Sequence, residues 1–392
     1  MPAVSLDDDV LAELRELASA HRLRVPRIVD GVQGPLAVID GREVINFASN
    51  DYLGLAGDPR LSRAAAAELE DSGTGVGASR LITGNHRQHV LLERAVADWL
   101  QTGGVRLFNT GYAANVGVLT SLLRAGDVVF SDELNHASII DGCRLSRADV
   151  VVIPHRDLAA LEAGLTARHG RRRIVVSESL FSMDGDLADI EAIAALCKRY
   201  DAAFVLDEAH AVGALGPEGR GLAADLGIVP DVVLGTFGKA LGSFGAFAAT
   251  TPAIADLLWN RARTLVFSTG LPPSVPAASR AALEVVRGAD GDQRRRTLAS
   301  HARRLRALVS RAGGALPSAI VPIVLGGEQA AMQCMERLLA GGLFVQGIRP
   351  PTVPIGTARL RVGLSAAHSV PQIELLGRAL DDAMRYEGPC PT

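Results

Sequence analysis

Asp231-Val-Val-Leu234 is a short apolar run, and Thr236-Phe-Gly-Lys-Ala-Leu-Gly242 follows it after one residue. This stretch decides the fold, because it places Lys239 just past a segment that is typical of a strand buried on both faces. The 392-residue chain has only two lysines, Lys198 and Lys239, beside 38 arginines (40 − 2). A lysine can lose its proton and form a Schiff base, whereas a guanidinium stays protonated. Lys198 ends an amphipathic helical pattern and is interpreted as solvated charge, which leaves Lys239 as the reactive candidate.

Similar apolar runs alternate with helical patterns from about residue 91 onward. Near-continuous apolar runs between helices predict an α/β fold with a large, mostly parallel central sheet flanked by helices. The other expected strands are 105–108, 127–130, 150–153, 174–177, 203–206 and 245–249.

The two ends of the chain lack the regular alternation of strands and helices that the middle of the chain shows. We expect a helix over 10–24 with Leu11, Leu14 and Leu17 on one face, and a hairpin over 36–47 around Asp40-Gly41. After an arginine-rich helix over 293–312, the C-terminal pattern is strand 320–325, helix 329–339, strand 360–364 and helix 372–384. These patterns predict an N-terminal helix and hairpin segment (1–60), a large cofactor-binding α/β domain (61–285) and a smaller C-terminal α+β domain (286–392), with the terminal segments packing together.

Bulk composition narrows the class of protein. Hydrophobic residues make up 48% of the chain and charged residues 21%, as in a soluble globular enzyme. The net charge of −3 gives no reason to expect a nucleic-acid partner. No apolar run approaches the length of a membrane span. The four cysteines, Cys143, Cys197, Cys334 and Cys390, have no CxxC spacing. We therefore expect a cytoplasmic protein without disulfides, metal sites or membrane partners.

Polar side chains follow several of the predicted strands. Asp207 and His210 follow one strand, Lys239 follows the next, and His136 follows an earlier one. Asn109-Thr-Gly-Tyr-Ala-Ala-Asn115 joins a further strand to a helix, whose N-terminal amides would suit a phosphate. The ends of parallel strands converge on one crevice of an open α/β sheet.

Pyridoxal 5′-phosphate explains this set of residues. An aspartate beside the pyridine nitrogen keeps the ring an electron sink, a lysine holds the aldehyde, and a helix N-terminus holds the phosphate.

Other interpretations of the sequence fit less well. The glycines of 73–77 follow no strand and precede no Gly-Lys-Ser/Thr, so they do not indicate a nucleotide loop. His86 and His89 could suggest a metal site, but they lack a HExxH pattern, so we expect them on a solvated or interface face of a helix. No Gly-x-Ser-x-Gly motif supports a serine hydrolase.

Longer motifs extend from about residue 46 to residue 368. They are Asn50-Asp-Tyr-Leu-Gly-Leu55, Gly73-Thr-Gly-Val-Gly-Ala-Ser-Arg80, His136-Ala-Ser138, Phe181-Ser-Met-Asp-Gly-Asp186, Asp207-Glu-Ala-His210, Gly219-Arg-Gly221 and Thr236-Phe-Gly-Lys239. Through them the chain resembles the fold-type-I, pyridoxal-phosphate-dependent α-oxoamine synthases. Ile348-Arg-Pro-Pro-Thr-Val-Pro354 and Gly356-Thr-Ala-Arg-Leu-Arg361 are similar to the member of that family that acts in biotin biosynthesis.

The resemblance implies specific roles for matching residues. Lys239 would form the Schiff base and remove the Cα proton, Asp207 would pair with the pyridinium nitrogen, and His136 would stack on the ring. Arg361 would clamp the amino-acid carboxylate, whereas its neighbour Arg359 is expected on the strand surface. Further cofactor contacts would be Gly111, Tyr112 and Thr236 at the phosphate, Ser182 and His210 at the ring hydroxyl, and Ser268 and Thr269 reaching the partner subunit's phosphate. Further substrate contacts would be Asn50, Ser79, Thr352 and Arg22, with Arg24 as a rival to Arg22.

The resemblance also implies a reaction and an assembly. The expected reaction condenses L-alanine with a pimeloyl thioester, carried on CoA or on a carrier protein, in a homodimer with shared active sites. Two alternatives stay open. One is a glycine-using member, either glycine C-acetyltransferase or 5-aminolevulinate synthase. The other is a non-catalytic binding protein of the same fold, which the presence of Lys239 disfavours.

Overall fold

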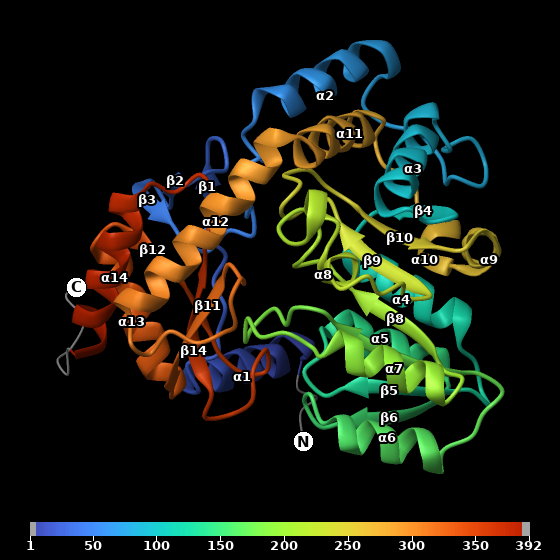
Figure 1. The fold of residues 1–392 in the computed structure, drawn as a ribbon. Coiled ribbons are helices and arrows are strands. Elements are labelled where there is room, and N and C mark those ends of the chain that lie inside the picture. Colours follow the sequence, from blue (N-terminus) through green and yellow to red (C-terminus); the bar gives the residue numbers. More distant parts are fainter. Residues whose placement is uncertain (1–4, 386–392) are drawn as a thin grey trace. The chain divides into compact units, whose positions relative to one another are not determined.

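The structure is a computed structural model that describes residues 5–385 (Figure 1). By its internal contacts the chain forms two compact units. We call residues 50–182 and 186–297 the larger unit, and residues 1–49, 183–185 and 298–392 the smaller unit. The three-part division expected from the sequence stays a prediction.

The larger unit is built on a seven-stranded sheet. Its order is β4-β10-β9-β8-β7-β5-β6, and β6, β5, β7, β8 and β9 run parallel to one another. This confirms the mostly parallel central sheet. The strands are β4 Gly104–Phe108, β5 Val128–Asp132, β6 Asp149–Ile153, β7 Arg173–Glu178, β8 Ala203–Asp207, β9 Val232–Thr236 and β10 Ala246–Thr250.

One strand of this sheet differs from the expectation. β10 is antiparallel to both of its neighbours, β9 and β4. Only residues 237–245 connect β9 to β10, which is too short for the helical crossover that a parallel connection needs. The pairing register places Gly235 opposite Phe247, and a Cβ at Gly235 would collide with the Phe247 ring. The aromatic ring therefore packs where the glycine leaves room.

Helices pack against this sheet and share one apolar core with its strands. Val118 and Leu119 of α4 are fully buried and belong to one apolar cluster with Val129 of β5 and Val205 of β8. The helices of the larger unit are α2 Pro59–Ser72, α3 Arg87–Leu100, α4 Gly111–Leu122, α5 Ala137–Ser146, α6 Leu158–Ala167, α7 Ile190–Arg199, η1 Pro217–Gly219, α8 Leu222–Asp225, α9 Pro252–Arg261, α10 Arg263–Val266 and α11 Ser274–Arg287. α12 Ala289–Leu308 contains the boundary between the two units.

The smaller unit contains two small sheets. One has the order β1-β2-β3-β12 and the other β11-β14-β13. The predicted hairpin is confirmed, and its turn residues Asp40 and Gly41 have φ values of 51° and 76°. The elements are α1 Leu6–Ser19, β1 Val29–Asp30, β2 Leu36–Ile39, β3 Arg42–Asn46, β11 Ile320–Gly326, α13 Glu328–Ala340, β12 Leu343–Phe344, β13 Gln346–Ile348, β14 Ala358–Gly363 and α14 Val370–Arg385.

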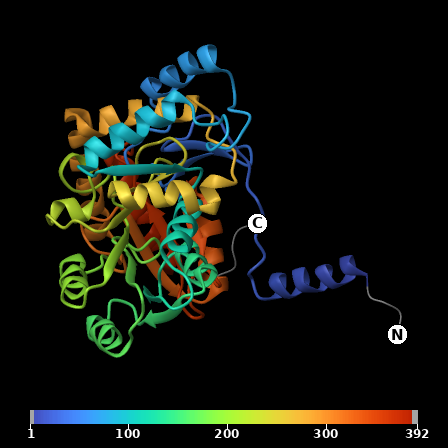
Figure 2. The ribbon, with the colours of Figure 1, turned by 90° about the vertical axis from the view of Figure 1, so that its right-hand side faces the viewer.

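The N-terminal helix begins and ends earlier than predicted. The Ser5 side chain accepts a hydrogen bond from the Asp8 amide and caps α1, while His21 adopts a left-handed φ of 54° just after its end. No residue of α1, the dark blue helix of Figure 2, is buried. Leu11, Leu14 and Leu17 are each more than 40% exposed on the helix.

The lengths of the helices and the state of the cysteines bear on two further expectations. Within residues 5–385, no helix is both long enough and apolar enough to cross a membrane. Cys143, Cys197 and Cys334 are buried free thiols. Cys390 lies outside the described residues.

Candidate active site

Two carboxylates end neighbouring strands of the larger unit. Glu178 is the last residue of β7 and Asp207 is the last residue of β8, and the register pairs them directly. Asn115 Nδ2 donates to one Asp207 oxygen at 2.7 Å, and the Ala209 amide donates to the other at 2.8 Å. The buried Asp207 carboxylate is therefore fixed at the strand end predicted from the sequence.

A chain of hydrogen bonds leads from Lys239 to Tyr52. Lys239 Nζ lies 2.8 Å from His210 Nε2, and His210 Nδ1 lies 2.7 Å from the Tyr52 hydroxyl. Tyr52 in turn donates to Asn50 Oδ1 at 3.1 Å. When Lys239 is protonated, these contacts are satisfied if His210 accepts at Nε2 and donates from Nδ1. The arrangement orients the lysine amine through a single histidine tautomer.

His136 is held beside the two carboxylates. Its backbone amide donates to Glu178 Oε1 at 2.6 Å, and its Nδ1 lies 2.7 Å from Ser138 Oγ. Burial lowers the pKa of His136, which favours a neutral ring. Burial, followed by the charge of Asp207, raises the pKa of Glu178 well above its usual range. A neutral imidazole at His136 suits a site that holds a flat cofactor ring.

The N-terminus of α4, where we expect the phosphate, is open. Thr110 caps the helix, Gly111 is its first residue, and a Cβ at Gly111 would meet no atom within 4 Å. This open space over backbone amides favours an anion. The Tyr112 hydroxyl donates to Asp141 at 2.6 Å, and Thr236 ends β9 with its hydroxyl bonded to the Gly245 carbonyl.

Four further predicted residues also lie in the larger unit. Ser79 forms an isolated β-bridge with Thr269, whose carbonyl accepts from Asn109 Nδ2 at 2.9 Å. Ser182 and Ser268 are half-buried in loops of the same unit. The larger unit thus holds every residue predicted to contact the cofactor.

The other predicted substrate residues lie in the smaller unit. Arg361 is a buried residue of β14. Arg22 pairs with Glu328 at 2.9 Å, whereas Arg24 donates to Thr352 Oγ1 at 3.0 Å. The expectation that Arg359 lies on the strand surface is wrong, because Arg359 is buried and forms an ion pair with Asp184.

Several site residues carried a weaker sequence signal. Tyr52 and Asn115 lie inside stretches already singled out, but no role was expected for them. Glu178 ends a predicted strand as Asp207 does, and this position was its only signal. The expected solvated or interface face at His89 is wrong, since His89 is fully buried with Nε2 2.9 Å from the Leu271 carbonyl. His86 instead caps α3.

Pyridoxal 5′-phosphate fits these residues. The larger unit offers an amine at Lys239, a fixed carboxylate at Asp207, a buried imidazole at His136 and an open helix N-terminus at Gly111. These are the groups needed for the aldehyde, the pyridine nitrogen, the ring face and the phosphate.

Known proteins are similar to this chain in both sequence and fold. The family described as "Aminotransferase class I and II" matches residues 42–380. The chain is 47% identical over 371 residues to the 8-amino-7-oxononanoate synthase of Geobacter sulfurreducens, covering 93% of this chain and 95% of that protein. It is 48% identical over 373 residues to the enzyme of that name from Anaeromyxobacter dehalogenans, covering 94% and 93%.

Solved structures agree with these relatives. A serine palmitoyltransferase from S. paucimobilis, with bound PLP and myriocin, superposes with a TM-score of 0.91 at 32% identity over 96% of this chain and 97% of that one. An 8-amino-7-oxononanoate synthase from Francisella tularensis superposes with a TM-score of 0.75 at 26% identity. The match covers 88% of this chain and 98% of that one. The fold and cofactor expected from the sequence are confirmed. The chain therefore belongs to the 8-amino-7-oxononanoate synthases, which are pyridoxal-phosphate-dependent acyltransferases of fold type I.

Proposed function

We propose that the chain condenses L-alanine with a pimeloyl thioester and releases carbon dioxide and the free thiol. The observation that carries this proposal is the 47% identity to 8-amino-7-oxononanoate synthases along more than nine-tenths of the chain. The product name accounts for the carbon atoms. Alanine without its carboxylate supplies C8, C9 and the amine, and the seven-carbon acyl group supplies C1 to C7 with the ketone at C7. A new C–C bond replaces the thioester bond.

We assign the cofactor roles to residues of the larger unit. Lys239 would hold the cofactor through Nζ, Asp207 would face the pyridine nitrogen, and His136 would lie on the ring. When bound, the cofactor supplies an electron sink for the negative charge that develops at the alanine Cα. The remaining contacts would be Gly111, Tyr112 and Thr236 at the phosphate, Ser182 and His210 at the ring hydroxyl, and Ser268 and Thr269 toward the cofactor of a partner subunit.

Lys239 would also move the proton. Once alanine has displaced it, its neutral amine would take the Cα proton. The contact with His210 Nε2 supports this role because it directs Nζ before the transfer. Arg361, assisted by Asn50, would bind the alanine carboxylate until it leaves as carbon dioxide. Arg22, Ser79 and Thr352 are the candidate contacts for the acyl substrate. A homodimer and a cytoplasmic location complete the proposal.

A substrate panel tests the proposed function. L-Alanine and glycine are each combined with pimeloyl-CoA, pimeloyl carrier protein, succinyl-CoA and acetyl-CoA. We expect alanine with a pimeloyl thioester to exceed the glycine pairs by at least about 100-fold in kcat/KM, equivalent to roughly 2.7 kcal/mol of transition-state binding. If glycine with acetyl-CoA or succinyl-CoA were the best pair, the chain would be a different α-oxoamine synthase. If no pair reacted while the cofactor was bound, the non-catalytic alternative would hold.

A further inference from the structure

A cavity of about 650 Å³ lies in the larger unit, at the edge of the central sheet opposite the candidate active site. This volume is in the range of small-molecule pockets. The cavity is lined by the first residues of the parallel strands β7, β8 and β9, whose last residues are Glu178, Asp207 and Thr236. β8 has five residues and is therefore about 16 Å long, so the two sites do not overlap. We call this cavity the strand-start pocket.

One part of the strand-start pocket is apolar. Ile254 and Leu257 of α9 line it, and both are half-buried residues that pack against the core of the larger unit. Val205 of β8 and Val232 of β9 also line the cavity. Such a surface favours a ligand with methylene groups, because removing apolar area from water stabilises the complex.

Two arginines of the pocket have no acidic partner. One terminal nitrogen of Arg172 donates to the Leu122 carbonyl at 2.8 Å, and Arg173 donates to two backbone carbonyls near the ends of α6 and α7. In the described part of the chain, no carboxylate forms an ion pair with either guanidinium. The neighbouring Arg171 is instead paired with the buried Asp127 at 2.7 Å. Neutral carbonyls therefore orient Arg172 and Arg173 and leave their charges unbalanced.

Two carboxylates of the same pocket are also without a cationic partner. Asp201 lies two residues before β8, and Asp231 lies directly before β9. Asp231 Oδ2 accepts from the Phe204 amide at 2.7 Å, which fixes the side chain without neutralising it. Between residues 5 and 385, no arginine, lysine or histidine forms an ion pair with either aspartate. The pocket thus presents positive charge at β7 and negative charge at β8 and β9.

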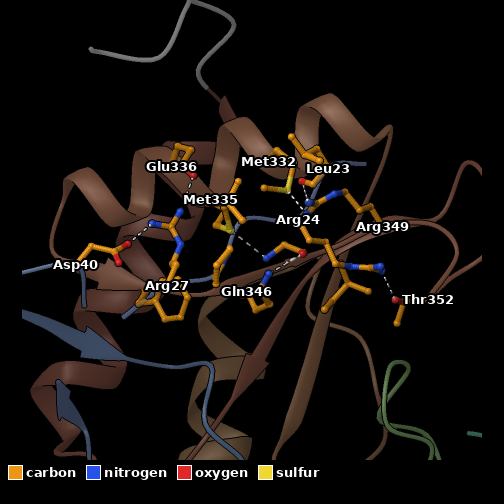
Figure 3. A pocket seen from close by; sticks show the side chains of 15 residues that line it. Leu23, Arg24, Arg27, Asp40, Met332, Met335, Glu336, Gln346, Arg349 and Thr352 are labelled. Carbon is orange, nitrogen blue, oxygen red and sulfur yellow. Dashed lines mark hydrogen bonds and ion pairs between the residues drawn. The ribbon is translucent and has the colours of Figure 1, made fainter. Parts of the chain in front are cut away.

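A cavity of the smaller unit shows the other arrangement, in which opposite charges of one cavity pair with each other (Figure 3). There Arg27 pairs with both Asp40 and Glu336, at 3.0 Å and 2.9 Å. In the strand-start pocket the charges stay apart because they belong to different strands. β8 lies between β7 and β9, so these two strands are separated by about 10 Å across the sheet.

We propose that the strand-start pocket binds an amino acid whose ammonium and carboxylate are separated by a methylene chain, the chemical class of the reaction product. The carboxylate would bind Arg172 and Arg173, the ammonium would lie beside Asp201 and Asp231, and the methylene groups would contact α9. The identity of this ligand with the product rests on the proposed function, which places the carboxylate at C1 and the amine at C8.

The length of the product fits the separation of the charges. Eight bonds join its carboxyl carbon to its nitrogen. An extended chain covers about 3.5 Å in three bonds, as in an extended polypeptide, so the eight bonds span about 9 Å. This length is close to the separation of β7 and β9. A shorter amino acid such as alanine cannot reach both ends.

The test uses 8-(dimethylamino)octanoate, which has the same eight-bond spacing and a tertiary amine that cannot form a Schiff base with the cofactor. Octanoate has the same carboxylate and methylene chain but no amine. Calorimetry on the cofactor-loaded enzyme measures both dissociation constants, with and without saturating L-alanine and with no acyl donor. We expect wild type to bind the dimethylamino acid about threefold to fivefold more tightly, the upper range for an exposed ion pair. Alanine should change neither constant.

Two variants and one control complete the experiment. Asp231→Asn keeps an oxygen for the Phe204 amide but removes the charge, so it should reduce the preference for the dimethylamino acid. Arg172→Gln, at an exposed residue, should weaken both ligands by up to about fivefold. Arg199→Gln removes a positive charge of the same unit, at an ion pair with Glu162 outside the pocket, and should change neither constant.

The outcomes are distinct. Absence of binding, or equal binding of the two ligands by wild type, overturns the proposal. Constants that rise when alanine is added would place the ligands in the active site and overturn it as well, and so would constants that are unchanged in both pocket variants. The proposed function is judged separately, by product formation in the substrate panel. An enzyme that binds the dimethylamino acid as expected but forms a different amino ketone would keep the pocket and lose the proposed function.

Discussion

The chemistry of Lys239 depends on its immediate contacts. His210 lies between Lys239 and Tyr52, with distances of 2.8 Å and 2.7 Å on its two sides. One ring nitrogen of His210 therefore directs the amine, while the other is fixed by the buried Tyr52 phenol. An amine held in this way can bond an aldehyde and later accept a proton, and a guanidinium can do neither.

We predict that Lys239→Arg reduces kcat by at least about 100-fold, the lower range for loss of a general base. Steady-state turnover with alanine and pimeloyl-CoA measures the effect, and circular dichroism checks the fold. Lys198→Arg is the matched control. Lys198 is exposed on α7, so its substitution should leave kcat unchanged and alter stability by less than about 0.5 kcal/mol. Near-normal turnover by Lys239→Arg would contradict the assignment.

The sequence signal was strong for some site residues and weak for others. Asp207 and Lys239 were predictable because each follows an apolar run, and parallel strands place their ends at one edge of the sheet. Glu178 occupies an equivalent position, but a single strand-end carboxylate does not reveal that it will be buried beside Asp207. The pairing of Arg24 with Thr352 joins residues 328 positions apart. Such a contact depends on tertiary packing, which local patterns do not encode.

At the scale of elements, His155 connects the end of β5 to a following turn. Its Nδ1 lies 2.9 Å from Asp132, the last residue of β5, and its Nε2 lies 2.9 Å from Asp186. Burial alone would lower the pKa of His155, but the hydrogen bonds and charges of the two aspartates outweigh it and raise the pKa to about 10. The imidazolium therefore fixes a turn close in sequence to Ser182.

This ion-paired histidine predicts a pH-dependent stability. Its folded pKa of about 10 exceeds the unfolded value of roughly 6.5, so its contribution is complete below about pH 6.5 and is lost as the pH rises through 10. We expect His155→Gln to destabilise the protein at pH 6 by roughly 1.5–3 kcal/mol, the range for hydrogen bonds to charged groups. The difference from wild type should shrink toward pH 10. Urea midpoints across this range measure it.

The control for this series is His169→Gln, at an exposed histidine of the same unit. Its difference from wild type should stay small at every pH. A His155→Gln difference that grew with rising pH would show that the folded state holds the neutral imidazole.

Strand direction shows a limit of prediction at the same scale. The run that became β10 has the composition of a buried parallel strand, because it is buried on both faces in either direction. Direction depends on the connection, and residues 237–245 had to be recognised as a turn. The hairpin over 36–47 was easier, since Asp40-Gly41 favours the positive φ values that its turn requires.

For the whole molecule, the predicted cofactor contacts and most of the predicted substrate contacts lie in different units. All predicted cofactor contacts belong to residues 50–182 and 186–297, whereas Arg22, Thr352 and Arg361, which are candidate substrate contacts, belong to the smaller unit. A ligand stabilises the folded region that it contacts by mass action.

We therefore predict that removal of the cofactor weakens the larger unit selectively. Hydrogen–deuterium exchange of the cofactor-free and cofactor-loaded forms should show several-fold faster exchange near the ends of β8 and β9 and at the start of α4. Peptides from α13 and α14 in the smaller unit serve as the internal control and should change little. Uniformly faster exchange along the chain would contradict a cofactor held by the larger unit.

The scarcity of lysine has a practical consequence for following cofactor loading. A protease that cuts only after lysine divides this chain into three fragments, because its two targets are Lys198 and Lys239. Reduction with borohydride would attach the cofactor permanently to Lys239 and block the second cut, so that only two fragments remain. The exposed Lys198 stays cleavable in both cases and serves as the internal standard. The ratio of fragments in a mass spectrum then reports the loaded fraction of the protein directly, without any assay of turnover.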